Sequence, residues 1–302
     1  MSQQAQPNLK SLPYGGASCV INKDLVEEVN NFIKQAAVQN VLENKDIQTQ
    51  FLSEYQNWIK TSKVNIFSGL DAFTISAFSN GTTEGFDKFM IKNHNKRFRC
   101  LRGEYMYHTA NYKKFFNWKF IEDEPLSKND AVVISMPFSD TGNIHPLTED
   151  ILADCDKLNI PVLIDSAFIG ICGNIKFNYN RECVTDITFS LSKSFPVANL
   201  RIGMRLSKID NDDGLLIHTK INYNNRISAA VGFQLITKYS ADYNYHMYRT
   251  AQLRFCEKLS VEASDSVIFG LSNKNFSEYN RGGFSNRLCF SKYLRHGILP
   301  EP

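Results

Sequence analysis

The chain has 302 residues, of which 43% are hydrophobic and 22% are charged. This balance is typical of a globular protein and excludes collagen-like and other fibrous structure. With 34 basic and 31 acidic residues the formal net charge is only +3. The sequence has no concentrated basic stripe of the kind that would indicate direct nucleic-acid binding.

The composition also bears on the compartment. No apolar run approaches the roughly 20 residues that a membrane-spanning helix needs, so no membrane partner is expected. Residues 1–16 lack the charged-then-apolar profile of a secretion signal. The seven cysteines are scattered and form no C-x-x-C pair, which is typical of reduced thiols rather than of disulfides or a zinc site. We therefore predict a cytoplasmic protein without a metal site.

Apolar periodicity predicts the order of the elements. Two helices are expected in the first sixty residues, one capped by Asn22 and one over roughly residues 45–61. Short apolar runs follow, and they are Ala72–Phe78, Ala131–Met136, Pro161–Ile164 and Ile187–Leu191. Helix-like stretches separate several of them or follow them, and these are Thr83–Lys92, Thr148–Leu158 and Asp212–Tyr239.

This order predicts the fold class. Short apolar strands that do not alternate with polar residues, separated by helices, are typical of a parallel sheet covered on both faces. Residues 242–302 indicate a helix followed by two short strands, Ser266–Leu271 and Asn286–Phe290, and hence a smaller second domain. Because ligands of such sheets bind beyond the carboxyl ends of the strands, chemistry is expected just after each apolar run.

The first of these strand ends is a glycine turn. Residues 78–85 end a strand, turn at Gly81 and begin a helix. Free backbone amides at a helix start bind anions, although a plain capped turn explains the same pattern. A second strand end runs into Ser139–Gly142, for which a proline-punctuated loop is an adequate explanation.

Two further strand ends carry charged residues. Asp165 follows a buried strand, where a carboxylate needs a partner, and no His, Cys or carboxylate cluster accompanies it to indicate a metal. Lys193 lies between Ser192 and Ser194, with Arg201 eight residues later. A lysine among hydroxyls is usually solvated, but hydroxyls and an arginine also suit a dianionic phosphate.

In chain order, the four strand ends resemble the fold-type-I pyridoxal-phosphate-dependent enzymes, in particular the class I/II aminotransferases. The matching segments are Asn80-Gly81-Thr82, Ser139-Asp140-Thr141-Gly142, Asp165-Ser166-Ala167-Phe168, Ser190-Leu191-Ser192-Lys193 and Leu200-Arg201-Ile202-Gly203. The resemblance covers roughly residues 70–206. It implies a three-layer α/β/α large domain with a mostly parallel sheet, and a smaller, shortened α+β domain.

The resemblance also implies a division of the chain. Residues 1–60 would form an N-terminal helical segment belonging to the small domain or to a dimer arm. Residues 61–240 would form the large cofactor-binding domain, and residues 241–302 the small C-terminal domain. The trimmed small domain would leave a more open site that admits a bulky or attached substrate.

The family implies a role for each matching residue. Lys193 would form the Schiff base with pyridoxal 5'-phosphate and then move the proton of the substrate's alpha carbon. Asp165 would keep the ring nitrogen protonated, which makes the ring an electron sink. The implied ligands of the phosphate, in the glycine turn and around the lysine, are Asn80, Gly81, Thr82, Ser190, Ser192 and Arg201.

Aromatic and basic residues complete the implied site. Tyr105 would stack on the cofactor ring, with Tyr107 as the alternative. Arg287 would bind the substrate's carboxylate, with Arg281 as the alternative. For both arginines, a solvated side chain without a binding role is also an adequate explanation. Tyr55 would reach the phosphate of a neighbouring subunit in a homodimer, unless it belongs to the core.

Two residues depart from the family pattern. Ser139 and Phe168 stand where asparagine and tyrosine usually donate hydrogen bonds to the ring hydroxyl of the cofactor. Phe168 cannot donate, and Ser139 is shorter than asparagine. The loss of donors is expected to raise the pKa of the Schiff base and to change its reactivity.

We therefore predict an aminotransferase that moves an amino group between an amino acid and an oxo acid or aldehyde. A decarboxylase or lyase on the same scaffold is the alternative, because cofactor motifs do not decide which bond breaks. The intact set of Asp165, Lys193 and Arg201 disfavours a non-catalytic binding or regulatory homologue. A nucleotide-binding protein is disfavoured because neither G-x-x-x-x-G-K-[S/T] nor G-x-G-x-x-G occurs.

Overall fold

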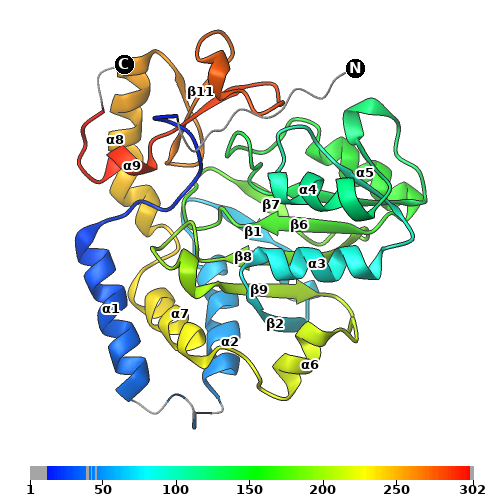
Figure 1. The fold of residues 1–302 in the computed structure, drawn as a ribbon, viewed down its shortest axis with the longest axis horizontal. Helices are drawn as coiled ribbons and strands as arrows, with labels where there is room; N and C mark the ends of the chain where they lie inside the picture. Colours follow the sequence, from blue (N-terminus) through cyan, green and yellow to red (C-terminus); the bar gives the residue numbers. More distant parts are fainter. Residues whose placement is uncertain (1–11, 39–40, 42, 45, 300–302) are drawn as a thin grey trace.

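A seven-stranded sheet forms the centre of the computed structural model, which describes residues 12–38, 41, 43–44 and 46–299 (Figure 1). The strand order is β2-β9-β8-β6-β5-β3-β4. The strands are β2 (Ile75–Asn80), β3 (Arg97–Cys100), β4 (Trp118–Phe120), β5 (Asp130–Ser135), β6 (Val162–Ser166), β8 (Val184–Ser190) and β9 (Ile202–Ser207). Strand β9 is antiparallel to both neighbours, and all the other pairs are parallel. The mostly parallel sheet is thereby confirmed.

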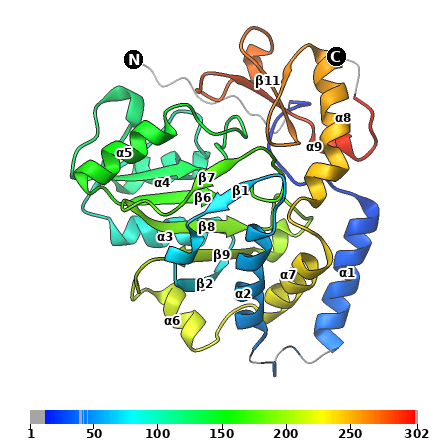
Figure 2. The same ribbon diagram turned by 180° about the vertical axis from the view of Figure 1, so that it is seen from behind.

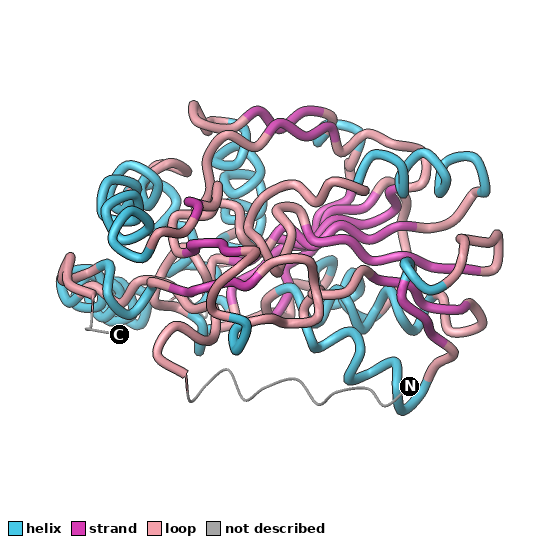
Figure 3. The backbone as a smooth tube through the Cα atoms, turned by 90° about the horizontal axis from the view of Figure 1, so that it is seen from above, coloured by secondary structure: helices cyan, strands magenta, loops and turns pink. Residues whose placement is uncertain are grey.

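Helices cover both faces of this sheet, which gives the expected three layers (Figure 3). On one face, α2 (Ile47–Lys60), α5 (Thr148–Leu158) and α7 (Arg226–Lys238) pack on the sheet in one core. On the other face lie α3 (Thr82–Lys92) and α4 (Met106–Phe115). Successive side chains of a strand point to opposite faces of the sheet, so an apolar strand contributes to the cores on both faces. In β5, Val132 belongs to the first core and Val133 to the second.

A smaller body lies beside the sheet at the level of its strand ends (Figure 2). Its elements are α8 (Tyr243–Leu259), β10 (Glu262–Ala263), β11 (Phe269–Ser272), β12 (Asn286–Cys289) and α9 (Ser291–Leu294). The three strands form an antiparallel sheet with a separate hydrophobic core, to which Tyr14 and Val20 of the N-terminal segment contribute. The domain limits at 60 and 240 stay predictions.

The remaining elements connect or border these bodies. Helix α1 (Lys23–Val38) packs against α7, and α6 (Gly214–Lys220) packs against β2. A parallel pair consists of β1 (Ile66–Ser68) and β7 (Lys176–Asn178). The short 3-10 helices are η1 (Leu70–Ala72), η2 (Ile121–Asp123), η3 (Ala198–Leu200) and η4 (Ser277–Tyr279). Within the described residues, no helix combines the length and apolar character needed to cross a membrane.

The helix-like stretch expected over Asp212–Tyr239 forms two capped helices, α6 and α7. The side chain of Asp213 accepts a hydrogen bond from the backbone N–H of Leu216, at 3.0 Å. The side chain of Asn225 accepts one from Ser228, also at 3.0 Å. Each cap satisfies a backbone donor that has no partner in the first helical turn, and so each begins a new helix.

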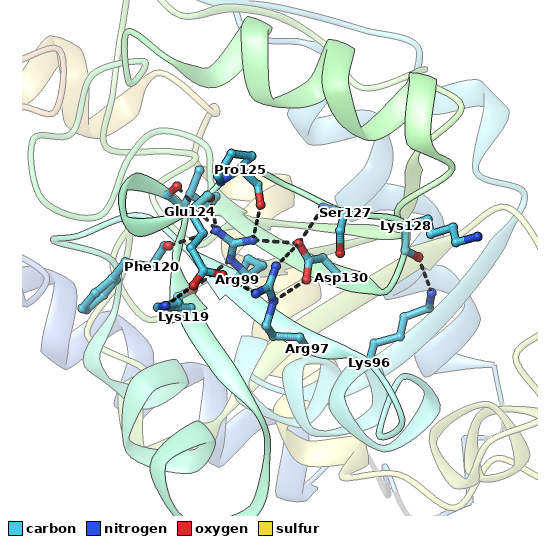
Figure 4. A network of polar contacts seen from close by, with 11 residues as sticks. Lys96, Arg97, Arg99, Lys119, Phe120, Glu124, Pro125, Ser127, Lys128 and Asp130 are labelled. Carbon is cyan, nitrogen blue, oxygen red and sulfur yellow. Dashed lines mark hydrogen bonds and ion pairs between the residues drawn. The ribbon is translucent and has the colours of Figure 1, made fainter.

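A buried arginine attaches the edge strand β4 to the rest of the sheet (Figure 4). Arg99 of β3 is fully buried and lies 2.7 Å from the carboxylate of Asp130, which also binds Arg97 at 2.7 Å. Its other N–H groups donate to backbone carbonyls of Lys119, Phe120, Glu124 and Pro125. Because buried donors need partners, Arg99 holds the loop after β4 in place.

Candidate active site

The strand ends that carry the predicted residues lie at one edge of the sheet. Strands β2, β3, β5, β6 and β8 end there, and the antiparallel β9 begins there. The predicted residues on these strands or just beyond them are Asn80, Gly81, Thr82, Tyr105, Ser139, Asp165, Phe168, Ser190, Ser192, Lys193 and Arg201. The reversed direction of β9 is what brings Arg201 beside the glycine turn.

Arg201 contacts the glycine turn directly. Its Nη2 donates to the backbone carbonyl of Asn80 at 3.0 Å and to the hydroxyl of Thr83 at 3.1 Å. Gly81 has φ +73°, and a Cβ there would lie 2.4 Å from the same Nη2. Only glycine allows both this backbone conformation and this approach. A guanidinium thus lies at the N-terminus of α3, and both favour a bound anion. The side chain of Asn80 turns away and donates to Glu84, at 3.0 Å.

Two hydroxyls lie at the end of β8, where Ser190 is the last residue of the strand and Ser192 follows it. Ser190 and Ser192 share a hydrogen bond, and the Ser190 hydroxyl also donates to the backbone carbonyl of Ile202, at 3.2 Å. Ile202 directly follows Arg201 at the start of β9. The hydroxyls, the guanidinium and the helix N-terminus together form a donor set suited to a phosphate dianion.

Lys193 follows this strand and is largely buried. Its Nζ donates to the backbone carbonyl of Ala17 at 2.7 Å. Burial lowers the pKa of Lys193, and the positive charge of Arg287 acts in the same direction, whereas Asp165 opposes it. A lowered pKa increases the fraction of neutral amine, which is the nucleophilic form.

Asp165 is buried near Lys193. One carboxylate oxygen accepts the backbone N–H of Ala167 at 3.1 Å. Burial raises the pKa of Asp165 to about 8, and the negative charge of Glu104 contributes to the rise. A carboxyl group in this situation gains strongly from a cationic partner, because such a partner stabilises the ionised form.

Glu104 was missed by the sequence analysis. Its carboxylate accepts the backbone N–H of Ser135 at 2.7 Å, the Ser135 hydroxyl and the backbone N–H of Tyr105. Ser135 is the register partner of Asp165 between β5 and β6. Burial raises the pKa of Glu104 to about 7. Its signal was a charged residue next to Tyr105 at a strand end, but β3 itself was not expected.

Tyr105 and Tyr107, the alternatives for the stacking ring, differ in their surroundings. Burial raises the pKa of Tyr105, as does the charge of Asp165, while the charges of Arg201 and Arg281 oppose the rise. Tyr105 is 39% exposed, so its ring is accessible. The hydroxyl of Tyr107 instead donates to Asp87 at 2.9 Å.

Arg281 and Arg287, the alternatives for carboxylate binding, meet at one atom. Both donate through Nη1 to the backbone carbonyl of Ser139, at 3.2 Å and 2.7 Å respectively. Arg287 lies over the ring of Phe269 at 4.4 Å, and Phe168 packs edge-on against that ring with centroids 5.6 Å apart. Phe168 therefore belongs to the apolar support of Arg287.

Tyr55 does not lie at the site. It is fully buried in the core between α2 and the sheet, 5.4 Å from Phe51 and 6.2 Å from Phe189 between ring centroids. The expectation that Tyr55 reaches a neighbouring subunit is wrong, because its hydroxyl is enclosed by its own chain.

Among the described residues, no three His, Cys, Asp or Glu side chains gather in a way that would hold a metal ion. All seven cysteines are buried and free. A surface hollow of about 430 Å³ borders η2 and α5, and its lining includes none of the predicted site residues.

The chain is similar to known proteins in both sequence and fold. Residues 91–240 match the sequence model of the aminotransferase class I and II family. Among solved structures, the chain is similar to tyrosine aminotransferase from Leishmania infantum, with 13% identity, a TM-score of 0.64, and coverage of 90% of this chain and 87% of that one. It is similar to aromatic aminotransferase from Pyrococcus horikoshii OT3, with 11% identity, a TM-score of 0.66 and coverage of 94% and 92%. A double mutant of Thermus thermophilus aspartate aminotransferase gives 12% identity, a TM-score of 0.64 and coverage of 93% and 88%.

None of the curated proteins compared matches the chain. The chain has the type I fold of the pyridoxal-phosphate-dependent aminotransferases. The chain belongs to the aminotransferase class I and II family, whose members generally depend on pyridoxal phosphate.

Proposed function

We propose that this protein is a pyridoxal 5'-phosphate-dependent aminotransferase that moves an amino group between an amino acid and an oxo acid or aldehyde. The observation that carries the proposal is the pair of Lys193 and Asp165, buried at adjacent strand ends and close enough for each to shift the pKa of the other. The contact between Arg201 and the glycine turn supplies the anion site beside them.

The residues present fit the cofactor. The turn at Gly81, the guanidinium of Arg201 and the hydroxyls of Ser190 and Ser192 would hold its phosphate, with Asn80 and Thr82 contributing backbone. Asp165, whose pKa is raised by burial, would gain a cationic partner in the ring nitrogen. Tyr105 and Phe168 would border the ring, and Ser139 would lie beside it. These last two residues offer fewer donors to the ring hydroxyl than the family usually does.

When bound, the cofactor supplies an electron sink for the charge that develops at the substrate's alpha carbon. The amine of Lys193, whose pKa is lowered by burial, would take the alpha proton and return it. The carboxylate of Asp165 would hold a proton on the ring nitrogen. Arg287 binds the substrate's carboxylate and orients it. The backbone carbonyl of Ala17 accepts a hydrogen bond from the amine of Lys193 and so holds its position.

The proposal is tested with purified protein and a panel of amino donors. We expect a yellow protein whose absorbance borohydride treatment abolishes, and conversion of the bound cofactor to its amine form by at least one donor. Release of carbon dioxide without that conversion would support the alternative, a decarboxylase on the same scaffold. A colourless protein that takes up no added cofactor would overturn both. We also propose a homodimer, which the mass in solution tests.

A further inference from the structure

Asp140 is a buried carboxylate without a hydrogen bond. Its exposed fraction is 0%, and neither carboxylate oxygen has a hydrogen-bond partner among the described residues. The cation nearest to it is Arg281, whose Nη1 lies 3.7 Å from Oδ1. An ionised carboxylate in such a position is costly unless an opposite charge lies close by.

Two glycines confine Asp140. A Cβ at Gly103, where φ is +88°, would lie 2.8 Å from the Cβ of Asp140. A Cβ at Gly283 would lie 2.3 Å from Oδ2. The side chain therefore occupies a slot between the loop after β3 and the loop before β12, and it has no room to swing away from Arg281.

Asp140 forms an ion pair with only one of the two buried arginines near it. Arg281 forms the ion pair with Asp140, and its charge also acts on the pKa values of Glu104 and Tyr105. Within the described chain, no carboxylate oxygen lies within 4.0 Å of the guanidinium of Arg287, and its Nε has no hydrogen-bond partner. Asp140 and Arg287 also act on each other through their charges, but at longer range than an ion pair, and the charge of Arg287 acts on Lys193 as well. Arg287 is thus the cation without an ion pair on the lysine side of the site.

We propose that Asp140 determines the charge of the substrate: it neutralises Arg281 and leaves Arg287 as the single cation for the substrate. The site therefore accepts substrates with one carboxylate and rejects those that bring a second acidic group toward Arg281. This inference rests on the proposed function, because it assumes that substrate binds at Arg287. Rejection follows from charge, since a second anion would meet a confined carboxylate in a buried site.

The test uses the cofactor-loaded protein and two ligands of equal carbon number, butyrate and succinate. Neither carries an amino group, so calorimetric titration measures binding without chemistry. We expect wild type to bind butyrate about tenfold or more tightly than succinate. In Asp140→Asn this preference should shrink by about tenfold, chiefly because succinate binding improves. Asp154→Asn, an exposed carboxylate on α5, is the matched control and should leave the preference unchanged.

Arg281→Gln keeps the inference testable if Asp140→Asn does not fold. With its cation gone, Asp140 should repel a second anion more strongly, so the preference for butyrate should widen. Wild type that binds succinate as tightly as butyrate would overturn the inference, as would variants that change both ligands equally. If either result is obtained with protein that shows the cofactor absorbance, it rejects only the role of Asp140. Absence of the cofactor absorbance would reject the proposed function instead.

Discussion

The side-chain amine of Lys193 donates a hydrogen bond to the backbone carbonyl of Ala17, at 2.7 Å. Ala17 belongs to an N-terminal segment that is tied to the smaller body. The backbone N–H of Cys289 donates to the carbonyl of Tyr14 at 2.7 Å, and the hydroxyls of Ser18 and Ser291 lie 2.9 Å apart. Residues 14–18 therefore connect the smaller body with the lysine turn.

Replacing the lysine tests the covalent attachment of the cofactor. Lys193→Ala is expected to lose the borohydride-sensitive absorbance, because the proposal assigns the Schiff base to the amine of Lys193. Lys208→Ala is the control, since burial lowers the pKa of Lys208 as well but its Nζ donates to the carbonyl of Arg181, on another part of the surface. Absorption spectra before and after borohydride make the comparison. A Lys193→Ala protein that is still fixed by borohydride would contradict the assignment.

Asp165→Asn separates cofactor binding from turnover. Asparagine keeps the shape of the side chain but cannot hold a proton on the ring nitrogen. We expect the variant to retain the cofactor while the turnover number falls by roughly 100-fold or more, as when other preorganised charges are removed. Cofactor titration and single-turnover kinetics measure the two effects separately. Unchanged turnover would show that Asp165 does not face the ring.

The buried carboxyls predict how stability without cofactor depends on pH. Burial raises the pKa of Asp165 to about 8 and that of Glu104 to about 7. The folded protein therefore binds these protons more tightly than the unfolded chain does. Their contribution to stability is full below about pH 4 and is lost as the pH rises through 7 and 8.

Urea unfolding of the cofactor-free protein should accordingly show a midpoint that falls from about pH 5 to about pH 8. In Asp165→Asn and in Glu104→Gln the fall should be smaller, by up to a few kcal/mol in the free energy of unfolding. Other titrating groups are shared by wild type and variants, so the difference isolates these two. Parallel pH profiles in all three proteins would contradict the prediction.

Two glycines with positive φ provide a test of the anion site. Gly81 and Gly16 have φ of +73° and +75°, so alanine introduces backbone strain at both. Only at Gly81 does the new Cβ meet Arg201, at 2.4 Å, whereas nothing lies within 4 Å at Gly16. We expect Gly81→Ala to weaken cofactor binding by about tenfold or more relative to Gly16→Ala. Equal affinities of the two variants for the cofactor would show that the turn at Gly81 does not bind the phosphate.

The arginine network at the sheet edge predicts a stability effect away from the site (Figure 4). Asp130→Asn leaves the charge of fully buried Arg99 without its carboxylate, which should lower the free energy of unfolding by about 3–5 kcal/mol. Asp71→Asn is the control, because that carboxylate is 87% exposed in its pair with Lys60 and should change stability little. Thermal unfolding measures the melting temperatures of the two variants, and equal melting temperatures would contradict the prediction.

The sequence predicted the bounds of those helices whose ends are marked by capping or turn residues. Helix α5 has the expected bounds, Thr148–Leu158, and α1 begins directly after Asn22, whose side chain accepts the N–H of Asp24 at 2.9 Å. Strand β9 was not expected, because its apolar residues follow the phosphate motif without a clear break. Strand β3 was not expected either, since Arg97 and Arg99 interrupt its apolar pattern, and only their distant partner Asp130 explains their burial.

The sequence by itself determined the class of fold and the residues that follow each strand, because turn residues and apolar runs act over a few neighbouring positions. The tertiary structure alone decided which distant side chains meet. It enclosed Tyr55 in the core, set Glu104 beside Asp165, and brought both Arg281 and Arg287 to the carbonyl of Ser139. These relationships depend on the burial and charge of segments far apart in the chain, for which no local pattern exists.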